Sequence, residues 1–212
     1  MSRRITVRGR AGSSGGSDHS SDTPILEKPE LQQVIRRTED AREALIGTLV
    51  YTLAGRVSET CEADVHALQY RNGGKVLRLR RKGDKVTDFP LPPRVLTLFD
   101  VVLDGRTHGP LLLDAEGRRL DRFDVDRLLT RLGKRAGVLP GRDLTPHVLR
   151  ACRLTHMHDD GVDLDEIREY ADHQNVATTL LYVRRRDDGT KRAAHAQAAV
   201  PLYDHLIDRW IP

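Results

Sequence analysis

Apolar side chains return every three or four positions along the chain after residue 24. Between residues 25 and 54 the spacing includes Leu49 and Leu53, and Gly55 follows shortly. This period is typical of an amphipathic helix, and glycine after the last apolar position often ends one. The pattern therefore predicts helix over 25–54, as one helix or as two with a break near Thr38.

Short apolar runs separated by turn residues come next. The runs cover Val65–Tyr70, Val76–Arg80 and Val86–Leu91, with Asn72-Gly73-Gly74 and Lys82-Gly83-Asp84-Lys85 between them. Glycine and asparagine adopt the positive φ angles that tight hairpin turns need. We therefore predict a small three-stranded antiparallel sheet.

The second half of the chain returns to helical spacing. Helices are predicted over Val95–Leu103 and Phe123–Ala136, from Thr145 to Gly161, and from Asp163 onward. Thr145 precedes a proline, which favours a helix start because the hydroxyl caps the helix and proline suits its first turn. The fold class is thus α+β and mainly α: a helical domain with one small antiparallel sheet.

Composition predicts the boundaries of this domain. Residues 1–24 are basic and rich in serine and glycine with few apolar groups, which predicts a disordered arm. Residues 25–190 form the predicted domain. Residues 191–212 predict a tail helix that either packs on another protomer or folds back onto its own domain. Its apolar side carries Leu202, Leu206, Ile207 and Trp210.

Length and composition also narrow the class of protein. With 212 residues, 38% of them hydrophobic, the chain is long enough for one domain with a substantial core. No apolar run approaches the roughly 18–20 residues of a membrane span, and the first residues lack the apolar core of a secretory signal. The two cysteines, Cys61 and Cys152, have no neighbouring metal-ligand spacing. We therefore expect no metal site and a cytoplasmic location.

Basic and acidic residues are segregated along the chain. There are 35 Lys and Arg against 31 Asp and Glu, a net charge of +4, and only six of the 35 are lysines. Residues 71–85 carry a local charge of +6 and residues 157–173 one of −6. Arginine suits phosphate because its planar guanidinium donates paired hydrogen bonds, so the separation favours one face toward nucleic acid. The alternatives are ordinary solvated faces and an arginine content set by a GC-rich genome.

The chain carries six residues suited to phosphoryl transfer, widely spaced and in a recognisable order. Transfer of a phosphodiester needs a nucleophile, positive charge on the non-bridging oxygens and a proton donor for the leaving oxygen. Each residue alone has an ordinary structural explanation, so it is the ordered set that points to chemistry. The set is Arg56, Lys82, His147, Arg150, His173 and Tyr182.

This ordered set resembles the tyrosine recombinase (phage integrase) family over roughly residues 30–190. The segment TPHVLRACRLTHMHDDGVDLDEIREYADHQNVATTLLY is similar to the family pattern TPHxLRHTxATxLxxxGxDLxxIxxxLGHxxxxTTxxY. The resemblance implies a site-specific DNA recombinase or integrase that works through a 3′-phosphotyrosine intermediate, with neither metal nor ATP. It also implies double-stranded DNA as the partner, a homotetramer on two DNA sites and a monomer without DNA.

The family pattern assigns a role to each member of the set. Tyr182 is the nucleophile, and Arg56 and Arg150 hold the non-bridging phosphate oxygens. Lys82 protonates the leaving 5′ oxygen. His147 accepts the proton of the tyrosine, and it shares one side of a predicted helix with Arg150, three positions on.

Two further residues complete the predicted site. His173 donates to a non-bridging oxygen, and Glu59 holds His147 or Arg56 in place. The basic residues near the hairpin and after the nucleophile are expected to contact DNA. They are Arg78, Arg80, Arg81, Lys85, Arg184 and Arg185.

Some positions have rivals or depart from the pattern. Lys85 competes with Lys82, and Tyr170 and Tyr203 compete with Tyr182. Asp172 replaces the usual glycine before the histidine, and we expect the turn to survive because aspartate tolerates left-handed backbone.

Only 55 residues precede Arg56, which by the resemblance implies a lone catalytic domain. Either the basic arm Arg3–Arg10 partly compensates for the missing amino-terminal clamp, or an accessory chain replaces it. The alternative functions are a non-catalytic DNA-binding regulator with the same fold and a type IB topoisomerase-like strand relaxer.

Overall fold

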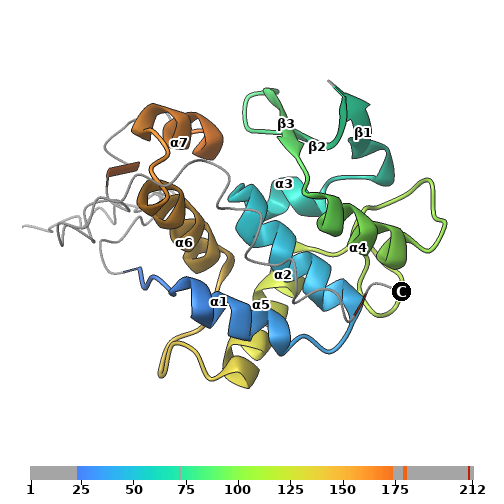
Figure 1. The fold of residues 1–212 in the computed structure, drawn as a ribbon. Coiled ribbons are helices and arrows are strands. Elements are labelled where there is room, and N and C mark those ends of the chain that lie inside the picture. The colour runs from blue at the N-terminus through green and yellow to red at the C-terminus, as the bar shows by residue number, and fades with distance from the viewer. Residues whose placement is uncertain (1–22, 72, 174–178, 181–209, 211–212) are drawn as a thin grey trace, which may run out of the picture.

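The computed structural model describes residues 23–71, 73–173, 179–180 and 210 (Figure 1). As predicted, this part of the chain is α+β and mainly helical, with one three-stranded antiparallel sheet. No described helix is long and apolar enough to cross a membrane. In chain order the elements are α1 (Lys28–Arg36), α2 (Ala41–Leu53), α3 (Val57–Cys61), η1 (Val65–Ala67), β1 (Leu68–Arg71), β2 (Gly74–Arg80), β3 (Val86–Pro90), α4 (Pro93–Leu103), α5 (Arg122–Ala136), α6 (Pro146–Asp159) and α7 (Leu164–Ala171).

The helical stretch 25–54 is divided into α1 and α2, so the second of the two alternatives is correct. Asp40 caps α2 by accepting a hydrogen bond from the Glu43 N–H at 2.6 Å. Thr38 is buried in the break, and its hydroxyl donates to the Ile35 carbonyl oxygen at 2.8 Å. These side chains satisfy backbone groups that the helix ends leave without helical partners.

The strands pair in the order β1-β2-β3. Leu77, in β2, lies opposite Leu68 of β1 and Phe89 of β3. Residues 65–67, predicted as strand, instead form the 3₁₀ turn η1, because the Ala67 N–H donates to the Asp64 carbonyl oxygen at 2.9 Å. The first strand therefore begins at Leu68 rather than at residue 65.

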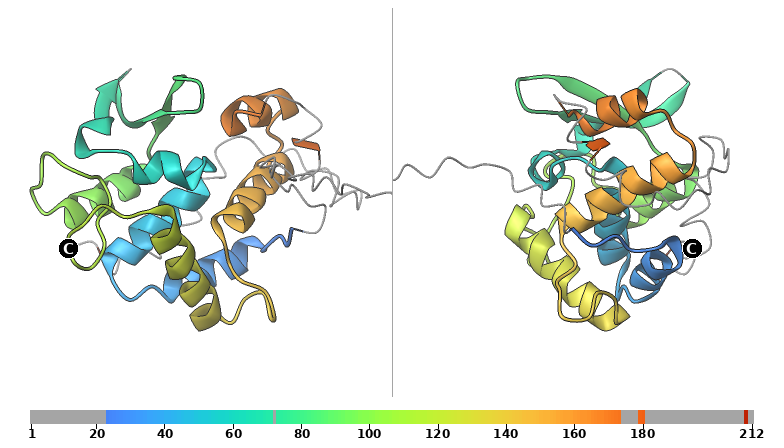
Figure 2. Two further views of the ribbon diagram at one scale, coloured as in Figure 1. Left: turned by 180° about the vertical axis from the view of Figure 1, so that it is seen from behind. Right: turned by 90° about the vertical axis from the view of Figure 1, so that its left-hand side faces the viewer.

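The helix α2 lies at the centre of the domain and is buried on nearly all sides. It packs against α1, α4, α5 and α6 (Figures 1 and 2), which explains its mostly apolar composition. On the neighbouring α5, a Cβ at Gly133 would lie 2.6 Å from the Leu144 Cβ, so only glycine fits that contact. Because α2 ends at Leu53, this packed core fixes the position of the site residue Arg56.

Residues 23–28 run along α6. The Leu26 N–H donates to the Cys152 sulfur at 3.2 Å, and His156 Nε2 bonds the Leu26 carbonyl oxygen at 3.0 Å. Thr23 is buried as well, although it lies inside the segment that composition assigns to a disordered arm. Residues 1–22 of that arm lie outside the described residues.

The predicted tail helix over 191–212 lies outside the described residues except for Trp210. The indole Nε1 of Trp210 donates to the Thr38 hydroxyl at 3.2 Å, and the ring packs against the core. Both contacts are within the same chain. For the rest of the tail, packing on its own domain and packing on another protomer both stay predictions.

Candidate active site

A pocket of about 320 Å³ lies where α3, α6 and the end of α7 meet. Four of the six residues of the predicted set line it, although they are widely separated in the sequence. They come from the start of α3, the first turns of α6 and the residue after the cap of α7. The lining consists of Gly55, Arg56, Val57, Pro146, His147, Arg150 and His173.

Arg150 is held by the ends of two helices. Its guanidinium donates to the carbonyl oxygen of Ala54, after α2, and to that of Ala171, at the end of α7 (2.7 Å). Ala54 is buried with a left-handed backbone (φ 43°). The Arg150 side chain is therefore oriented before any ligand arrives, as electrostatic stabilisation of a phosphate requires.

Arg150 also fixes the protonation pattern of His173. Its Nη2 lies 2.8 Å from His173 Nε2, and because a guanidinium only donates, Nε2 must be the acceptor. The proton of the neutral ring is then on Nδ1, 3.0 Å from the buried Thr179 hydroxyl. Thr179 is thus a partner of the site that the sequence analysis did not single out.

Arg56 lies directly before α3 with its side chain 47% exposed. Its Nη1 donates to Glu59 Oε1 at 3.1 Å, and its backbone N–H bonds the other carboxylate oxygen at 3.2 Å. Glu59 is buried. Of the two partners that the sequence left open for Glu59, the structure places Arg56 beside it.

Arg81 corrects one prediction. Its place in the basic hairpin predicts a DNA contact, but its side chain is only 1% exposed. It bonds Glu59 Oε2 at 3.4 Å and the Tyr170 carbonyl oxygen at 2.9 Å. The signal was present: residues two apart on a strand share a face, so Arg81 follows the buried Leu77 and Leu79 inward.

The other basic residues of the hairpin point outward. Lys82 is exposed in the β2–β3 turn and forms no ion pair with any described residue. Lys85 binds Asp172 at 2.8 Å, and Arg78 donates two hydrogen bonds to Asp88. Arg80 is 79% exposed. The remaining predicted DNA contacts, Arg184 and Arg185, lie outside the described residues.

Asp172 ends α7 in the left-handed conformation (φ 54°), so the turn tolerates aspartate as predicted. Partial burial raises the pKa of its carboxyl group. The hydrogen bond from Lys85 and the charges of Arg81 and Arg56 lower that pKa by more, and the net shift is downward. The side chain is therefore an anion at neutral pH.

His147 contacts a residue outside the predicted domain. Its Nε2 lies 3.2 Å from the hydroxyl of the buried Thr23. The start of its helix is the predicted one, since the Thr145 hydroxyl accepts a hydrogen bond from the Val148 N–H at 3.3 Å. No signal in the local sequence pairs Thr23 with His147, because 124 positions separate them.

Tyr182 and its rival Tyr203 lie outside the described residues, whereas the other rival, Tyr170, is described and partly buried. The hydroxyl of Tyr170 donates to the Thr52 carbonyl oxygen, and its ring packs edge-on against Phe89. Burial raises the pKa of Tyr170. A phenol that is partly buried, hydrogen-bonded and harder to ionise is poorly suited to attack a phosphate.

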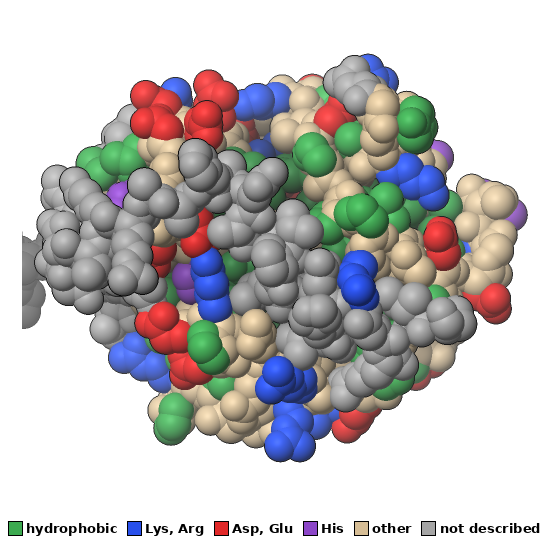
Figure 3. Space-filling model, in the orientation of Figure 1, with side chains coloured by type: hydrophobic (Ala, Val, Ile, Leu, Met, Phe, Trp, Pro, Cys, Tyr) green, Lys and Arg blue, Asp and Glu red, His purple; other side chains and the backbone are tan. Residues whose placement is uncertain are grey.

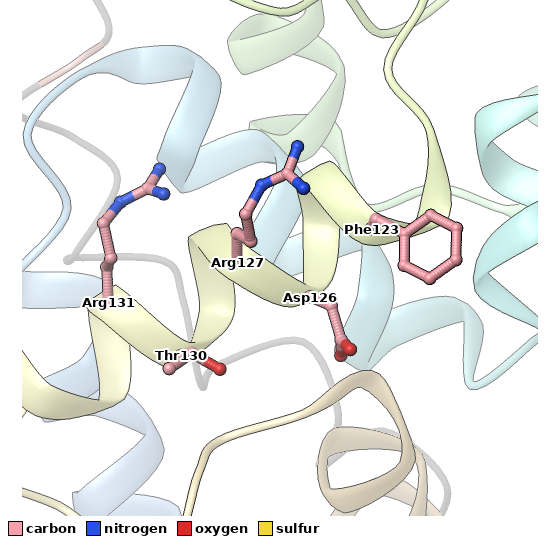
Figure 4. A pocket seen from close by; sticks show the side chains of 5 residues that line it. All are labelled: Phe123, Asp126, Arg127, Thr130 and Arg131. Atoms are coloured by element: carbon pink, nitrogen blue, oxygen red, sulfur yellow. The ribbon is translucent and has the colours of Figure 1, made fainter.

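A second hollow in the described part of the chain lacks this combination of groups. A hollow of about 370 Å³ on the outer side of α5 is lined by Phe123, Asp126, Arg127, Thr130 and Arg131 (Figure 4). It offers arginines without a histidine. Figure 3 shows acidic side chains gathered over α7. Within the described ranges, no cluster of three or more His, Cys, Asp or Glu is placed to hold a metal ion.

A mainly helical domain that sets two arginines and two histidines around one pocket is the architecture that the sequence resemblance implies. The model of the phage integrase family matches residues 25–188. The chain belongs to this family, the tyrosine recombinases.

Individual relatives agree with this membership. The tyrosine recombinase XerA of Pyrococcus furiosus is 32% identical over 163 residues, which are 74% of this chain and 55% of the relative. The chain thus spans about half the length of the curated relative that it matches. Among solved structures, XerA recombinase superposes with a TM-score of 0.66 at 25% identity, covering 77% of this chain and 61% of that one. XerH bound to palindromic difH substrate superposes at 0.67 with 20% identity, covering 76% and 50%, and shows the fold.

Proposed function

We propose that this chain carries the catalytic domain of a site-specific recombinase that cuts and rejoins duplex DNA through Tyr182. The observation that carries the proposal is the convergence of Arg56, His147, Arg150 and His173 on one pocket. A pair of guanidinium groups suits a phosphodiester, because they donate hydrogen bonds to its charged oxygens. His147 can accept a proton, and His173 bonds Arg150.

The proposed reaction has two halves. The Tyr182 oxygen attacks the phosphorus while His147 accepts the phenolic proton, which a group of pKa near 10 must lose to become a good nucleophile. The bond to the 5′ oxygen breaks, and the Lys82 ammonium protonates that oxygen. The products are a 3′-phosphotyrosine and a free 5′-hydroxyl. The new bond conserves the phosphodiester energy, so rejoining requires no nucleotide, and no metal is needed for these steps.

Chain connectivity supports Tyr182 as the nucleophile. Thr179 bonds His173 directly, and Tyr182 follows three positions later. Three residues span at most about 11 Å, because consecutive Cα atoms lie about 3.8 Å apart. This covalent limit on the distance from Thr179 favours Tyr182 over Tyr203, which follows 24 positions after Thr179.

Duplex DNA is the proposed partner. The pocket presents cations, and the structural neighbour XerH was solved on its difH substrate in a post-cleavage complex. We further propose a tetramer on two DNA sites and a monomer without DNA. Because this chain covers about half of its relative, we propose that a further domain or an accessory chain supplies the rest of the DNA clamp.

A covalent-adduct assay tests the reaction. Duplexes selected from random sequence by binding to the protein are nicked close to each candidate cleavage point, so that the short fragment diffuses away after cleavage. We expect a protein–DNA adduct that resists denaturation, that Tyr182→Phe abolishes and that the matched Tyr203→Phe variant retains.

Other outcomes of this assay identify other functions. Tight binding without an adduct on any duplex contradicts the proposal and favours a regulator. Adducts that form at many unrelated sequences, together with relaxation of supercoiled plasmid, favour a topoisomerase-like strand relaxer.

A further inference from the structure

Asp172 places a negative charge at the edge of a pocket for an anion. Its left-handed backbone requires no side chain, since glycine adopts that conformation freely. The carboxylate is only 17% exposed and lies 2.8 Å from Lys85 Nζ and 3.8 Å from Arg56 Nη1. The contacts of this side chain, rather than the shape of the turn, therefore call for a functional explanation.

The β2–β3 turn is fastened on both sides. The Arg81 N–H donates to the Lys85 carbonyl oxygen at 2.6 Å, which closes the turn around Lys82. On one side the buried Arg81 is bonded to Glu59 and to the backbone of α7. On the other side Lys85 is bonded to Asp172. Lys82, between these attachments, has its side chain in solvent.

We propose that Asp172 is a positioning residue for Lys82. By holding Lys85, it keeps the β2–β3 turn against the end of α7, so that the Lys82 ammonium faces the leaving 5′ oxygen of a bound phosphodiester. Its contact with Arg56 ties the same turn to the phosphate pocket. This inference rests on the proposed function, because it concerns the proton donor of that reaction.

The proposal predicts that removal of the Asp172 charge has opposite effects on DNA binding and on cleavage. A carboxylate close to the DNA phosphate repels it, so removal of Asp172 should strengthen DNA binding. Removal should also slow cleavage, because the turn loses one attachment. A residue that merely stabilises the fold would change both quantities in the unfavourable direction.

The first test separates binding from cleavage. Asp172→Gly and Asp172→Asn both suit the left-handed backbone, and Glu169→Gln removes an exposed charge from the same helix as a matched control. At saturating protein on a nicked duplex, we expect both Asp172 variants to form the adduct up to about fivefold more slowly. This factor corresponds to the loss of one ion pair with a solvent-exposed partner. Their dissociation constants should fall by roughly two- to threefold. Equal cleavage rates, or weaker binding together with slower cleavage, would overturn the inference.

The second test asks whether the defect passes through Lys82. In a duplex with sulfur in place of the bridging 5′ oxygen, the phosphorus–sulfur bond breaks to release a thiolate, which needs no proton donor because a thiol is far more acidic than an alcohol. We expect this substrate to restore cleavage by Lys82→Ala, and to restore Asp172→Gly and Lys85→Ala in the same way.

Slow cleavage of the sulfur substrate by Asp172→Gly, alongside rescue of Lys82→Ala, would show that Asp172 does not act through the proton donor. A different result addresses the function itself. If the wild-type chain forms no adduct on either substrate, the proposed reaction is wrong and the inference falls with it.

Discussion

Two cations of the candidate site are held in opposite ways. Arg150, on α6, gives hydrogen bonds to the Ala54 and Ala171 carbonyl oxygens and to His173. Lys82, in the β2–β3 turn, extends into solvent and has no ionic partner in the described part of the chain. Arg150 belongs to the packed core of the domain, whereas Lys82 belongs to an exposed turn that its neighbours Arg81 and Lys85 attach to the end of α7.

This difference separates two demands of the proposed chemistry. A group that stabilises charge is most effective when its orientation is fixed beforehand, because nothing then has to reorganise during the reaction. A proton donor must reach one oxygen of a ligand that arrives later. Changes on α6 should therefore affect both stability and cleavage, whereas changes at the tip of the turn should affect cleavage alone.

The largest effect is expected from Arg150→Ala. Adduct formation should slow by about 10³-fold, since one strong donor to the phosphate is lost. The unfolding free energy should fall by about 2 kcal/mol, because two buried carbonyl groups lose their partner. Single-turnover cleavage and urea unfolding measure the two quantities. The exposed Arg131 serves as control, and Arg131→Ala should leave both near wild type; cleavage by Arg150→Ala within tenfold of wild type would contradict the assignment.

Lys82→Ala should slow cleavage by about 10²-fold, a usual contribution of general acid catalysis. Its unfolding free energy should stay within about 0.5 kcal/mol of wild type, as for other exposed positions. Lys134→Ala is the matched control, because Lys134 is an exposed lysine that pairs with the exposed Asp143. A clear loss of stability in Lys82→Ala would contradict the expectation that changes in the turn affect cleavage alone.

The smallest effect concerns pH and the stability of α6. Burial, with a further contribution from Lys28, lowers the pKa of His156 to about 4, below the usual 6.5 of the unfolded chain. The unfolded state therefore binds the proton first as the pH falls, and stability decreases. Between pH 7 and pH 5 this group should remove about 2 kcal/mol from the unfolding free energy.

Urea unfolding at several pH values measures this dependence. His156→Gln should flatten the slope between pH 5 and pH 7, even if its stability at pH 7 is lower. An unchanged slope in the variant would place the titrating group elsewhere.

Much of the fold was predictable because it depends on neighbours in the chain. Helical spacing, the Thr145 cap and the Gly83 turn involve residues at most a few positions apart, and the elements appear where these signals predict them. The left-handed backbone of Asp172 was predictable for the same reason. Even the inward direction of Arg81 was available from the alternation of β2, although charge alone had suggested a surface position.

The partners of the charged groups were decided by tertiary structure. Asp172 meets Lys85, and His147 meets Thr23, across 87 and 124 positions of sequence. Such pairs have no local signature, because they exist only after the end of α7 meets the β2–β3 turn and residues 23–28 pack along α6. The sequence determined which chemical groups the site contains and in what order, and packing decided which of them are held rigidly, which face solvent and which charge lies beside the pocket.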